Sequence, residues 1–404
     1  QKQPRGNEGK IGSSARGWNN RSQRAQLSKG MRLAVKPMAA RRRSGHCLHR
    51  YRLSTRPSNS RKREDLPSRF DPSDTRRAFR GMSSAEIIAR YALVKVSSVP
   101  GVVSTVRNVT TSALSKTTTT GLAGIFCQWY IGLLRATVFR LYVAGEEIND
   151  CRKVSERLVE HDMRIIVDHS TEEKTDTASW ANNIRSKAKL FQALPDILGR
   201  SQERHFVPIK ITGLASPHLL EKMSRILTEK FTDSYEDTYD HAEEVLNYLT
   251  AEELALYRNS FENLSQVCEM GIEAGVGVLL DAEETNRQPA IDLIAMNLMK
   301  KHNRVCPNIY NTFQMYLRGG LRRLRRDVEH ARIQRYHSAF KLVRGAYMVN
   351  ERLRATKLGK GDPIMISKAA TDDQYNAGLE LLLHQVASSK KSSENSVSVL
   401  IATH

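Results

Sequence analysis

The stretch FKLVRGAYM, from Phe340 to Met348, combines two cations with two very small residues where an apolar strand should end. Lys341 and Arg344 alternate with apolar residues, and Gly345 and Ala346 follow directly. Fixed cations attract anionic groups, and small residues let a ligand approach the main chain. This combination predicts a site for a flat, anionic ligand such as a nucleotide cofactor.

Three further residues could complete such a site. Tyr347 offers an aromatic ring beside the glycine, while Lys368 and Thr371 in ISKAATDDQY add a cation and a hydroxyl. Each of these side chains, taken alone, is more often a solvated loop residue than a ligand-binding one. Only their convergence at one place in the fold would favour the cofactor interpretation.

Two earlier motifs carry charges at the end of apolar runs. In VPIKITGL, Lys210 must either find a partner in the interior or reach solvent at the strand end, because an unpaired buried charge is costly. In LLDAEET, Asp281 is the acid nearest the strand, and we expect it to face Lys210. Glu283 shares the face of Asp281, and Glu284 takes the other face.

Strand-like runs and helical segments alternate from residue 164 to the last residue. The runs are RIIVDHS, FVPIKITGL, GVGVLLDAEE, NIYNTFQMYL, FKLVRGAY and VSVLIATH. This alternation predicts an α/β fold with parallel strands and crossover helices. None of the strand–helix junctions carries the GxGxxG of a dinucleotide fold, and polar residues follow nearly every strand, as at the mouth of a (βα)8 barrel. Because six strands are visible, we expect an incomplete TIM-like barrel in a truncated chain.

The charge of the 404-residue chain is concentrated in its first 80 residues. The net charge is +20, and residues 1–80 hold 22 Lys and Arg against 5 Asp and Glu. No acid occurs between Glu8 and Glu64, which is typical of an organelle presequence, and Met31 could open one. A basic arm that binds nucleic acid has the same composition, but this segment has few aromatic residues and no base-reading motif, so we favour the presequence and predict no nucleic-acid partner.

Residues 81–163 are predicted to form a helical region between the leader (1–80) and the barrel (164–404). Helical patterns cover 85–96 and 134–163, the second with a break at Gly145, and the Ser/Thr-rich segment 97–121 predicts a loop or a mobile helix. The apolar run 121–134 is shorter than the ~18 residues of a membrane span, so we expect a buried or membrane-surface helix there.

The arginine cluster at 322–326 predicts a solvated helix face, and the scattered cysteines predict no metal site.

In their order along the chain, RLYVAGEE, IIVDHSTEE, IKITGL, LLDAEET, NIYNTFQMYL, KLVRGAYM and VLIATH resemble the proline dehydrogenase family, from about residue 134 to 404. The resemblance implies a distorted (βα)8 barrel that binds FAD. It further implies oxidation of L-proline to Δ1-pyrroline-5-carboxylate, with electrons passed to quinone at the matrix side of the inner mitochondrial membrane, where the enzyme associates peripherally.

The resemblance also implies roles for single residues. Lys210 would bind the substrate carboxylate, Asp281 would organise the substrate pocket, and Tyr347 would line the cavity shared by flavin and substrate. The implied FAD-binding residues are Gln314, Lys341, Arg344, Gly345, Ala346, Tyr347, Lys368, Thr371, Thr403 and His404.

The sequence departs from the family pattern in two ways. Lys341 stands where many relatives have arginine, which removes a bidentate donor. An asparagine directly after His404, and a final helix with two carboxylate-binding arginines, are expected but do not occur in this sequence. Two other functions therefore stay open: a hydroxyproline dehydrogenase on the same scaffold, and a non-catalytic protein or inactive fragment that binds polyanions through its basic leader.

Overall fold

The computed structural model describes residue 79 and the ranges 82–116, 121–160, 165–168, 177–198, 204–230, 244–389 and 396–403. The predicted leader, apart from residue 79, and the predicted cofactor residue His404 lie outside the described residues. The presequence therefore stays a prediction from composition.

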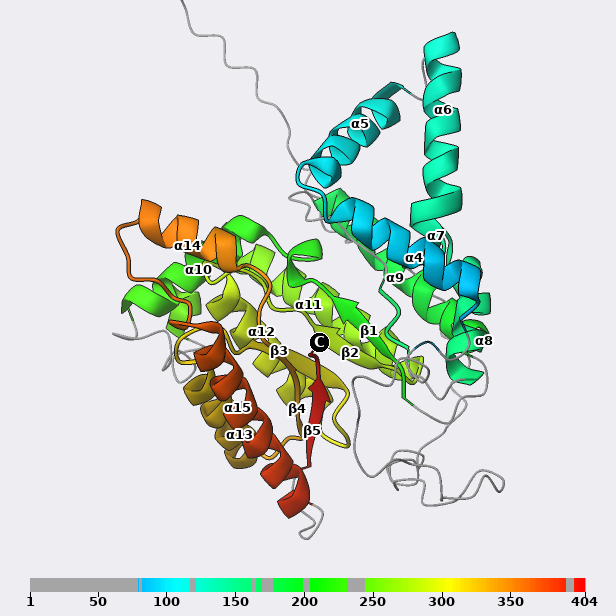
Figure 1. The fold of residues 1–404 in the computed structure, drawn as a ribbon. Helices are drawn as coiled ribbons and strands as arrows, with labels where there is room; N and C mark the ends of the chain where they lie inside the picture. The colour runs from blue at the N-terminus through cyan, green and yellow to red at the C-terminus, as the bar shows by residue number, and fades with distance from the viewer. Residues whose placement is uncertain are drawn as a thin grey trace, which may run out of the picture. The chain divides into compact units, whose positions relative to one another are not determined.

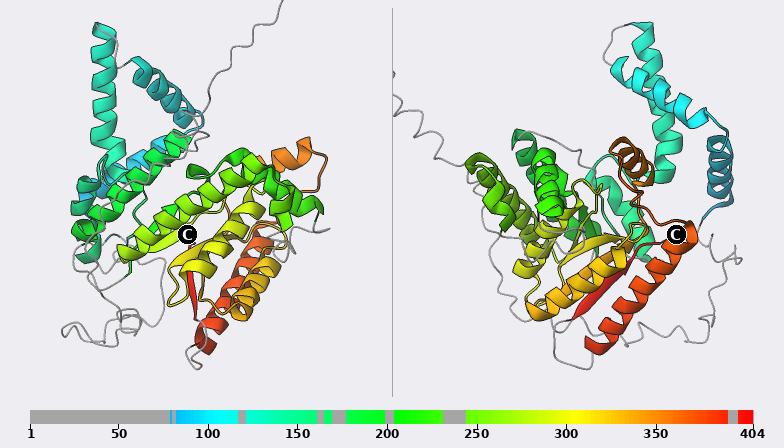
Figure 2. Two further views of the ribbon diagram at one scale, coloured as in Figure 1. Left: turned by 180° about the vertical axis from the view of Figure 1, so that it is seen from behind. Right: turned by 90° about the vertical axis from the view of Figure 1, so that its left-hand side faces the viewer.

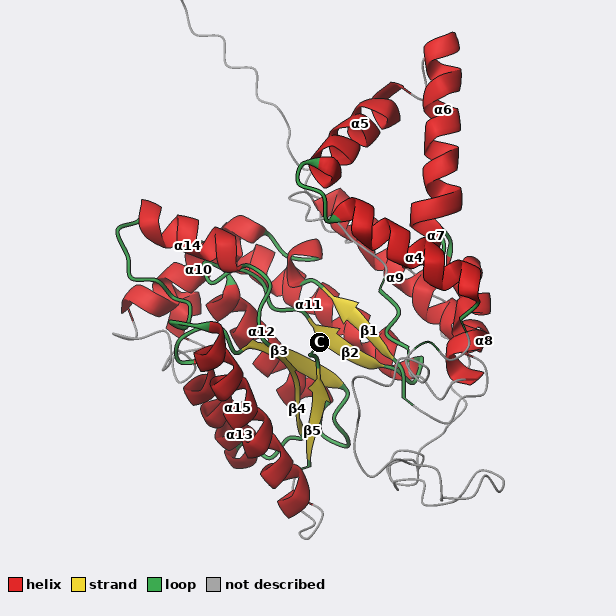
Figure 3. Ribbon diagram, viewed as in Figure 1, coloured by secondary structure: helices red, strands yellow, loops and turns green. Residues whose placement is uncertain are grey.

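A five-stranded parallel sheet forms the centre of the part after residue 204 (Figures 1 and 3). Its strands are β1 (Phe206–Ile209), β2 (Gly277–Leu280), β3 (Ile309–Gln314), β4 (Ser338–Val343) and β5 (Val397–Ile401), and they lie side by side in this order. A parallel bridge between Ile166 and Phe206 places residues 165–168, from the predicted RIIVDHS strand, beside β1. The order never reverses, so the described sheet has no topological switch point of the doubly wound kind.

Helices alternate with the strands, and several of them pack against one face of the sheet. They are α9 (Thr177–Leu198), α10 (Pro217–Lys230), α11 (Ala251–Glu273), α12 (Gln288–His302), α13 (Gly320–Ile333), α14 (Met348–Lys357) and α15 (Lys368–Ser389). Figure 1 shows α11 and α12 behind the sheet, the left view of Figure 2 shows them in front of it from the opposite side, and α13 lies beside α15. The predicted alternation of strands and helices is confirmed.

The two faces of the sheet differ because strand residues alternate between them. Residues that point toward the helices, among them Val278, Leu280 and Phe340, belong to one large apolar core. Residues on the opposite face form only a small apolar cluster around Leu279 and Tyr310. Beyond this cluster, toward the carboxyl ends of the strands, the second face becomes polar.

The N-terminal helical region contains α4 (Ser84–Ser97), α5 (Val102–Lys116), α6 (Leu122–Leu134), a π-helical turn (Arg135–Phe139), α7 (Arg140–Tyr142) and α8 (Cys151–Glu160). The predicted break at Gly145 is confirmed: the Asp150 side chain accepts hydrogen bonds from the backbone of Glu146 and Glu147, and a Cβ at Gly145 would lie 2.1 Å from Asp150 Cβ. The loop alternative for residues 97–121 is wrong for α5, which packs against α6.

The arginine-rich helix α13 is only partly a solvated face. Arg322 and Arg325 are exposed, but Arg323 is buried and its guanidinium donates to Asp292 of α12 at 2.8 Å. Asp327, one turn further, is buried as well. The periodicity of the arginines could not reveal this, because the partner carboxylate lies on another helix.

Candidate functional site

A row of polar side chains crosses the second face of the sheet near the carboxyl ends of the strands. Leu280 is in register with Asn311, and Thr312 with Lys341, so Asp281, Thr312 and Lys341 lie level on three neighbouring strands. Side chains level with one another in a parallel sheet share a face. The register thus brings residues 281 and 341 toward each other across β3.

Asp281 and Lys341 form an ion pair in this row. Lys341 Nζ donates to Asp281 Oδ1 at 2.8 Å, and the two side chains keep 18% and 24% exposure for Lys341 and Asp281 respectively. Sequence reasoning paired Asp281 with Lys210 instead. Both side chains are mostly buried but keep some contact with solvent, so the pair can still contact a ligand.

Lys210 lies at the end of β1 with its side chain exposed. The backbone turns directly into a 3₁₀ helix, Ile211–Gly213, for which Lys210 is the N-terminal flanking residue. Lys210 itself keeps extended backbone angles (φ −85°, ψ 125°) and lies level with Asp281, but the carboxylate of Asp281 pairs with Lys341. Of the two alternatives for this lysine, the structure has the one that reaches solvent at the strand end.

A chain of hydrogen bonds links the ends of β1 to β4. Thr212 Oγ1 donates to Glu283 Oε1 at 2.8 Å, and Gln314 Nε2 donates to the Glu283 carbonyl at 2.8 Å. The backbone N–H of Ala346 donates to Gln314 Oε1 at 3.4 Å. The buried Gln314 amide therefore connects the DAEET and RGAY motifs, and it holds the backbone after β4 in place.

Gly345 is a position where no other residue fits. Its φ is +145°, and a Cβ there would lie 1.9 Å from Cδ1 of Tyr316. The Tyr316 N–H in turn donates to the Arg344 carbonyl at 2.7 Å. The close contact between glycine backbone and aromatic ring leaves Gly345 and Ala346 exposed on their other side, as predicted for a surface that a ligand approaches.

A second cationic group surrounds Asp372 in the first turns of α15. Arg344 Nε donates to Asp372 Oδ1 at 2.6 Å, and Lys368 Nζ donates to Oδ2 at 2.5 Å. The guanidinium stacks over the Tyr375 ring at 4.5 Å and also donates to the Thr403 hydroxyl. The structure thus brings together three residues that sequence reasoning assigned to one site.

Tyr347 and Thr371 differ in how their hydroxyls can be used. Tyr347 precedes α14, and burial, followed by the charges of Glu283 and Asp281, raises the pKa of its phenol. Its hydroxyl therefore stays protonated at neutral pH and can donate a hydrogen bond. Thr371 is buried and donates to the Ser367 carbonyl within its own helix at 3.1 Å, so its hydroxyl is not directed at a ligand.

Two charged residues that sequence reasoning missed support this edge of the sheet. Glu351 of α14 is buried, and it accepts hydrogen bonds from the N–H and Oγ1 of Thr285, both at 2.6 Å, which fastens α14 to the DAEET motif. Lys187 of α9 is buried and donates to the Pro208 carbonyl at 3.3 Å. Burial lowers its pKa, while the carboxylates of Asp168 and Asp281 act in the opposite direction.

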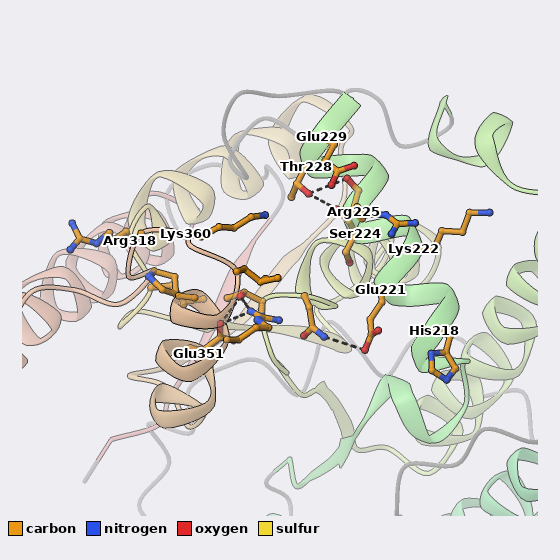
Figure 4. A pocket seen from close by; sticks show the side chains of 18 residues that line it. His218, Glu221, Lys222, Ser224, Arg225, Thr228, Glu229, Arg318, Glu351 and Lys360 are labelled. Atoms are coloured by element: carbon orange, nitrogen blue, oxygen red, sulfur yellow. Dashed lines mark hydrogen bonds and ion pairs between the residues drawn. The ribbon is translucent and has the colours of Figure 1, made fainter.

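A hollow near these motifs lies between α10 and α14, with a volume of about 790 Å³ (Figure 4). Glu221 of α10 accepts a hydrogen bond from Asn286 at 3.1 Å on one wall, and Glu351 lies on the opposite side. None of the predicted site residues lines it. The candidate site is therefore the strand edge and not this cavity.

The residues at the strand edge suit the cofactor that the sequence motifs imply. Gly345 presents an exposed backbone where a Cβ could not be accommodated, and Arg344 is fixed by an aspartate, a threonine and a tyrosine ring. Lys341 and Lys368 add positive charge from neighbouring elements. A flat group with attached phosphates matches both the open backbone and the cations.

Comparison with known proteins gives consistent results. A mitochondrial proline dehydrogenase 1 of Dictyostelium discoideum is 28% identical over 289 residues, which cover 67% of this chain and 49% of the relative. The Caenorhabditis elegans counterpart is 40% identical over 162 residues, covering 40% of this chain and 26% of the relative. A hydroxyproline dehydrogenase of Xenopus laevis is 28% identical over 257 residues, covering 62% of this chain and 55% of the relative.

A solved structure supports the fold. The crystal structure of proline utilization A from Bdellovibrio bacteriovorus, inactivated by N-propargylglycine, superimposes with a TM-score of 0.52 at 18% identity, over 68% of this chain and 27% of that chain. The chain spans about half the length of the Dictyostelium relative. The family model described as proline dehydrogenase matches residues 151–404, well over half of the sequence, and the chain therefore belongs to the proline dehydrogenase family.

Proposed function

We propose that this chain takes part in the FAD-dependent oxidation of L-proline to Δ1-pyrroline-5-carboxylate, with quinone as the electron acceptor. The observation that carries the proposal is the polar strand edge, where the Asp281–Lys341 pair and the exposed Gly345–Ala346 backbone are joined through Gln314. Membership of the family supports the same reaction.

The cofactor would be held by residues from three elements. Arg344 and Lys368 would meet its phosphates, the Gly345–Ala346 backbone would allow close approach, and Gln314 would contact the flavin. Thr403 would help through its hydrogen bond with Arg344, and Lys341 would add charge. When bound, FAD supplies the acceptor for the hydride that leaves the substrate.

Three side chains of this chain would act on proline itself. Lys210 extends from the end of β1 and would pair with the substrate carboxylate, which is a charge-assisted contact. Asp281, oriented by Lys341, would organise the substrate pocket. Tyr347 would line the cavity and donate a hydrogen bond from a phenol whose raised pKa keeps it protonated.

We also propose that residues 164–404 form part of a distorted (βα)8 barrel, with 81–163 as a separate helical region. The sequential strand order and the division between an apolar helix-facing side and a polar second side support this architecture. Barrel strands arrange their inward residues in level layers, as Asp281, Thr312 and Lys341 are arranged here.

Mitochondria are the proposed location, with residues 1–80 as the presequence and the inner membrane as the site of electron transfer. Relatives are named mitochondrial, and the acid-free segment from Gly9 to Arg63 has presequence composition. A fusion of residues 31–80 to a fluorescent reporter should enter mitochondria. A cytosolic or nuclear signal would contradict the proposal.

The direct test uses the full chain purified with added FAD. The protein should be yellow, and L-proline should reduce both an electron-accepting dye and a soluble quinone. Gly345→Ala should lower flavin content, because the added methyl group collides with Tyr316. Gly359→Ala is the matched control: its φ is also positive, at +62°, but nothing lies within 4 Å of the added Cβ. A colourless protein with salt-sensitive polyanion binding would favour the non-catalytic alternative.

Hydroxyproline is the second candidate substrate, since a hydroxyproline dehydrogenase matches over a comparable length. The ratio of kcat/KM for L-proline and for trans-4-hydroxy-L-proline decides between them. A ratio well above one supports proline, and a ratio below one supports hydroxyproline.

A further inference from the structure

Helix α6 carries a stripe of large apolar side chains that no protein surface covers in the described part of the chain. Their relative exposure is high, for example 87% at Leu122, 66% at Phe126 and 64% at Trp129. We call this set the α6 stripe; its residues are Leu122, Ile125, Phe126, Trp129 and Leu133. The spacing of three and four residues places all of them on one side of the helix.

The opposite side of α6 is already occupied, so the stripe is a second apolar face. Helix α5 packs against α6, and Thr110 Oγ1 of α5 lies 3.2 Å from the hydroxyl of Tyr130 of α6. Gly124 of α6 is buried. A helix that is apolar on both sides requires an apolar environment beyond its one protein neighbour.

The neighbouring helices also carry exposed apolar side chains. In α4, Ile88 and Tyr91 are 67% and 63% exposed, and in α5 Val103 is 59% exposed. Single exposed apolar residues are normal, but several large ones on one side of a helix, as in the α6 stripe, mark an interaction site. Length and composition also allow the helical stretch Leu122–Phe139 to enter a membrane, with 11% of it buried in the protein.

The charges of this region identify the partner. Between Glu86 and Glu146 the sequence contains no acidic residue, while six cations occur, at Arg90, Lys95, Arg107, Lys116, Arg135 and Arg140. Arg135 follows α6 directly, and its side chain is 60% exposed although its Nε lies 2.7 Å from Glu146 Oε1; Lys116 precedes α6 in the sequence. Long basic side chains beside an apolar helix reach the headgroup layer, and anionic lipids attract them by about 1 kcal/mol each.

We propose that the α5–α6 pair inserts into the hydrocarbon layer of an anionic membrane through the α6 stripe. The charge pattern favours lipid over a second protein, because a protein partner would need a matching acidic rim around an apolar centre. Trp129 suits the boundary between headgroups and acyl chains. The insertion makes this region an integral membrane anchor, whereas the family resemblance implies only peripheral association. Membrane binding of this kind does not require substrate or cofactor.

The test compares the full chain with two double variants by flotation with vesicles. Vesicles of phosphatidylcholine with phosphatidylglycerol should bind the protein more tightly than pure phosphatidylcholine, and binding should persist in high salt and at alkaline carbonate pH. Ile125→Glu with Phe126→Glu should weaken salt-resistant binding by at least about tenfold, because charged side chains in the bilayer are unfavourable by a few kcal/mol each. The basic leader is unchanged in both variants, and high salt removes its contribution.

The matched control is Val305→Glu with Ile333→Glu, which changes two apolar residues that are 68% and 62% exposed outside the helical region. It should bind vesicles like the unchanged chain. In a Trp18→Phe background, brominated acyl chains should quench the remaining fluorescence, and adding Trp129→Phe should remove most of that quenching, since Trp180 is buried. Equal, salt-reversible binding of all variants, or quenching that Trp129→Phe leaves unchanged, would overturn the proposal. Flavin content and proline oxidation are measured separately, so their loss would contradict only the proposed enzymatic function.

Discussion

Asp292 and Asp281 both form an ion pair beside the sheet, but their surroundings differ. Asp292 lies on the helix-facing side, where Arg323 donates to Oδ2 at 2.8 Å and Gln288 and Asn311 donate to Oδ1 at 2.7 and 3.1 Å. The side chains of this pair are 3% and 4% exposed for Arg323 and Asp292. Asp281, on the second face, has Lys341 at 2.8 Å and stays 24% exposed.

The difference separates a structural charge pair from one that can act on a ligand. The carboxylate of Asp292 is saturated by donors from two helices and a strand, so it fixes α12 and α13 against β3. The carboxylate of Asp281 keeps a solvent-facing part at the edge where cations and open backbone converge. We therefore expect the first pair to govern stability and the second to govern activity.

The largest expected effect is on stability, from Arg323→Met. Removing one partner of a fully buried pair leaves an uncompensated charge, and the free energy of unfolding should fall by about 3–5 kcal/mol. Urea denaturation followed by circular dichroism measures it. Arg322→Met, at the exposed neighbouring position, should change stability by less than about 0.5 kcal/mol. A similar small loss for Arg323→Met would show that this pair is not a structural anchor.

Stability should also depend on pH, because the buried Asp327 lies close to the Arg323–Asp292 ion pair. Burial raises its pKa to about 7, and the charges of Arg326 and Arg323 reduce that rise only in part. The folded state therefore binds this proton more tightly than the unfolded state does. The free energy of unfolding should decrease as pH rises from about 4 to about 7, by up to about 4 kcal/mol at 1.36 kcal/mol per pKa unit.

Asp327→Asn isolates this contribution, because the amide does not titrate. Urea denaturation at several pH values between about 4 and 8 should show a shallower decrease in stability for the variant. Parallel curves for the variant and the unchanged chain would contradict the assignment of the pH dependence to Asp327.

The opposite pattern is expected at the second pair. Lys341→Met removes a charge-assisted hydrogen bond from the partly exposed Asp281, and efficiency with proline should fall by about 10- to 100-fold, which corresponds to 1.5–3 kcal/mol. The free energy of unfolding should fall by clearly less than the ~3–5 kcal/mol expected for the fully buried pair, because Lys341 and Asp281 keep 18% and 24% exposure. Asp281→Asn, and the double variant, complete a cycle that measures the coupling between the two side chains. Unchanged kinetics together with a large loss of stability would reverse the comparison.

The sequence predicted most of the sheet, because alternating apolar runs and amphipathic segments reflect a local period that packing does not change. The 3.6-residue pattern likewise predicted α4, α10 and α12. For α5 it left a loop and a mobile helix both open, since threonine and valine disfavour an isolated helix, and the structure has the helix. Packing against α6 and the Thr110–Tyr130 contact compensate for that low propensity.

The site was predictable as a set of motifs but not as a set of contacts. The RGAY and DAEET motifs indicated which residues would gather at the strand edge. The partner of Asp281 depends on how β2 and β4 are aligned in register through the intervening strand β3. No local sequence pattern contains this information. Lys187 and Glu351 were not predicted for a related reason. A charged residue on a helix is buried only when another part of the chain packs over it, and the sequence does not show that packing.

The smallest expected effect concerns Lys210, whose exposed side chain has the weakest structural support of the predicted substrate residues. If it binds the substrate carboxylate, Lys210→Met should reduce kcat/KM for proline by about tenfold, the lower end of a charge-assisted contact. The loss should appear mainly in KM, with flavin content and thermal stability unchanged, because no fold contact depends on an exposed lysine. Lys189→Met changes another exposed lysine, on α9, and should leave both kinetic constants unchanged. Arginine at position 210 should recover part of the affinity, since it keeps the charge but not the ammonium geometry. Kinetics that match the Lys189 control would assign Lys210 to the solvated surface and leave substrate recognition on this chain to the Asp281–Lys341 pair and Tyr347.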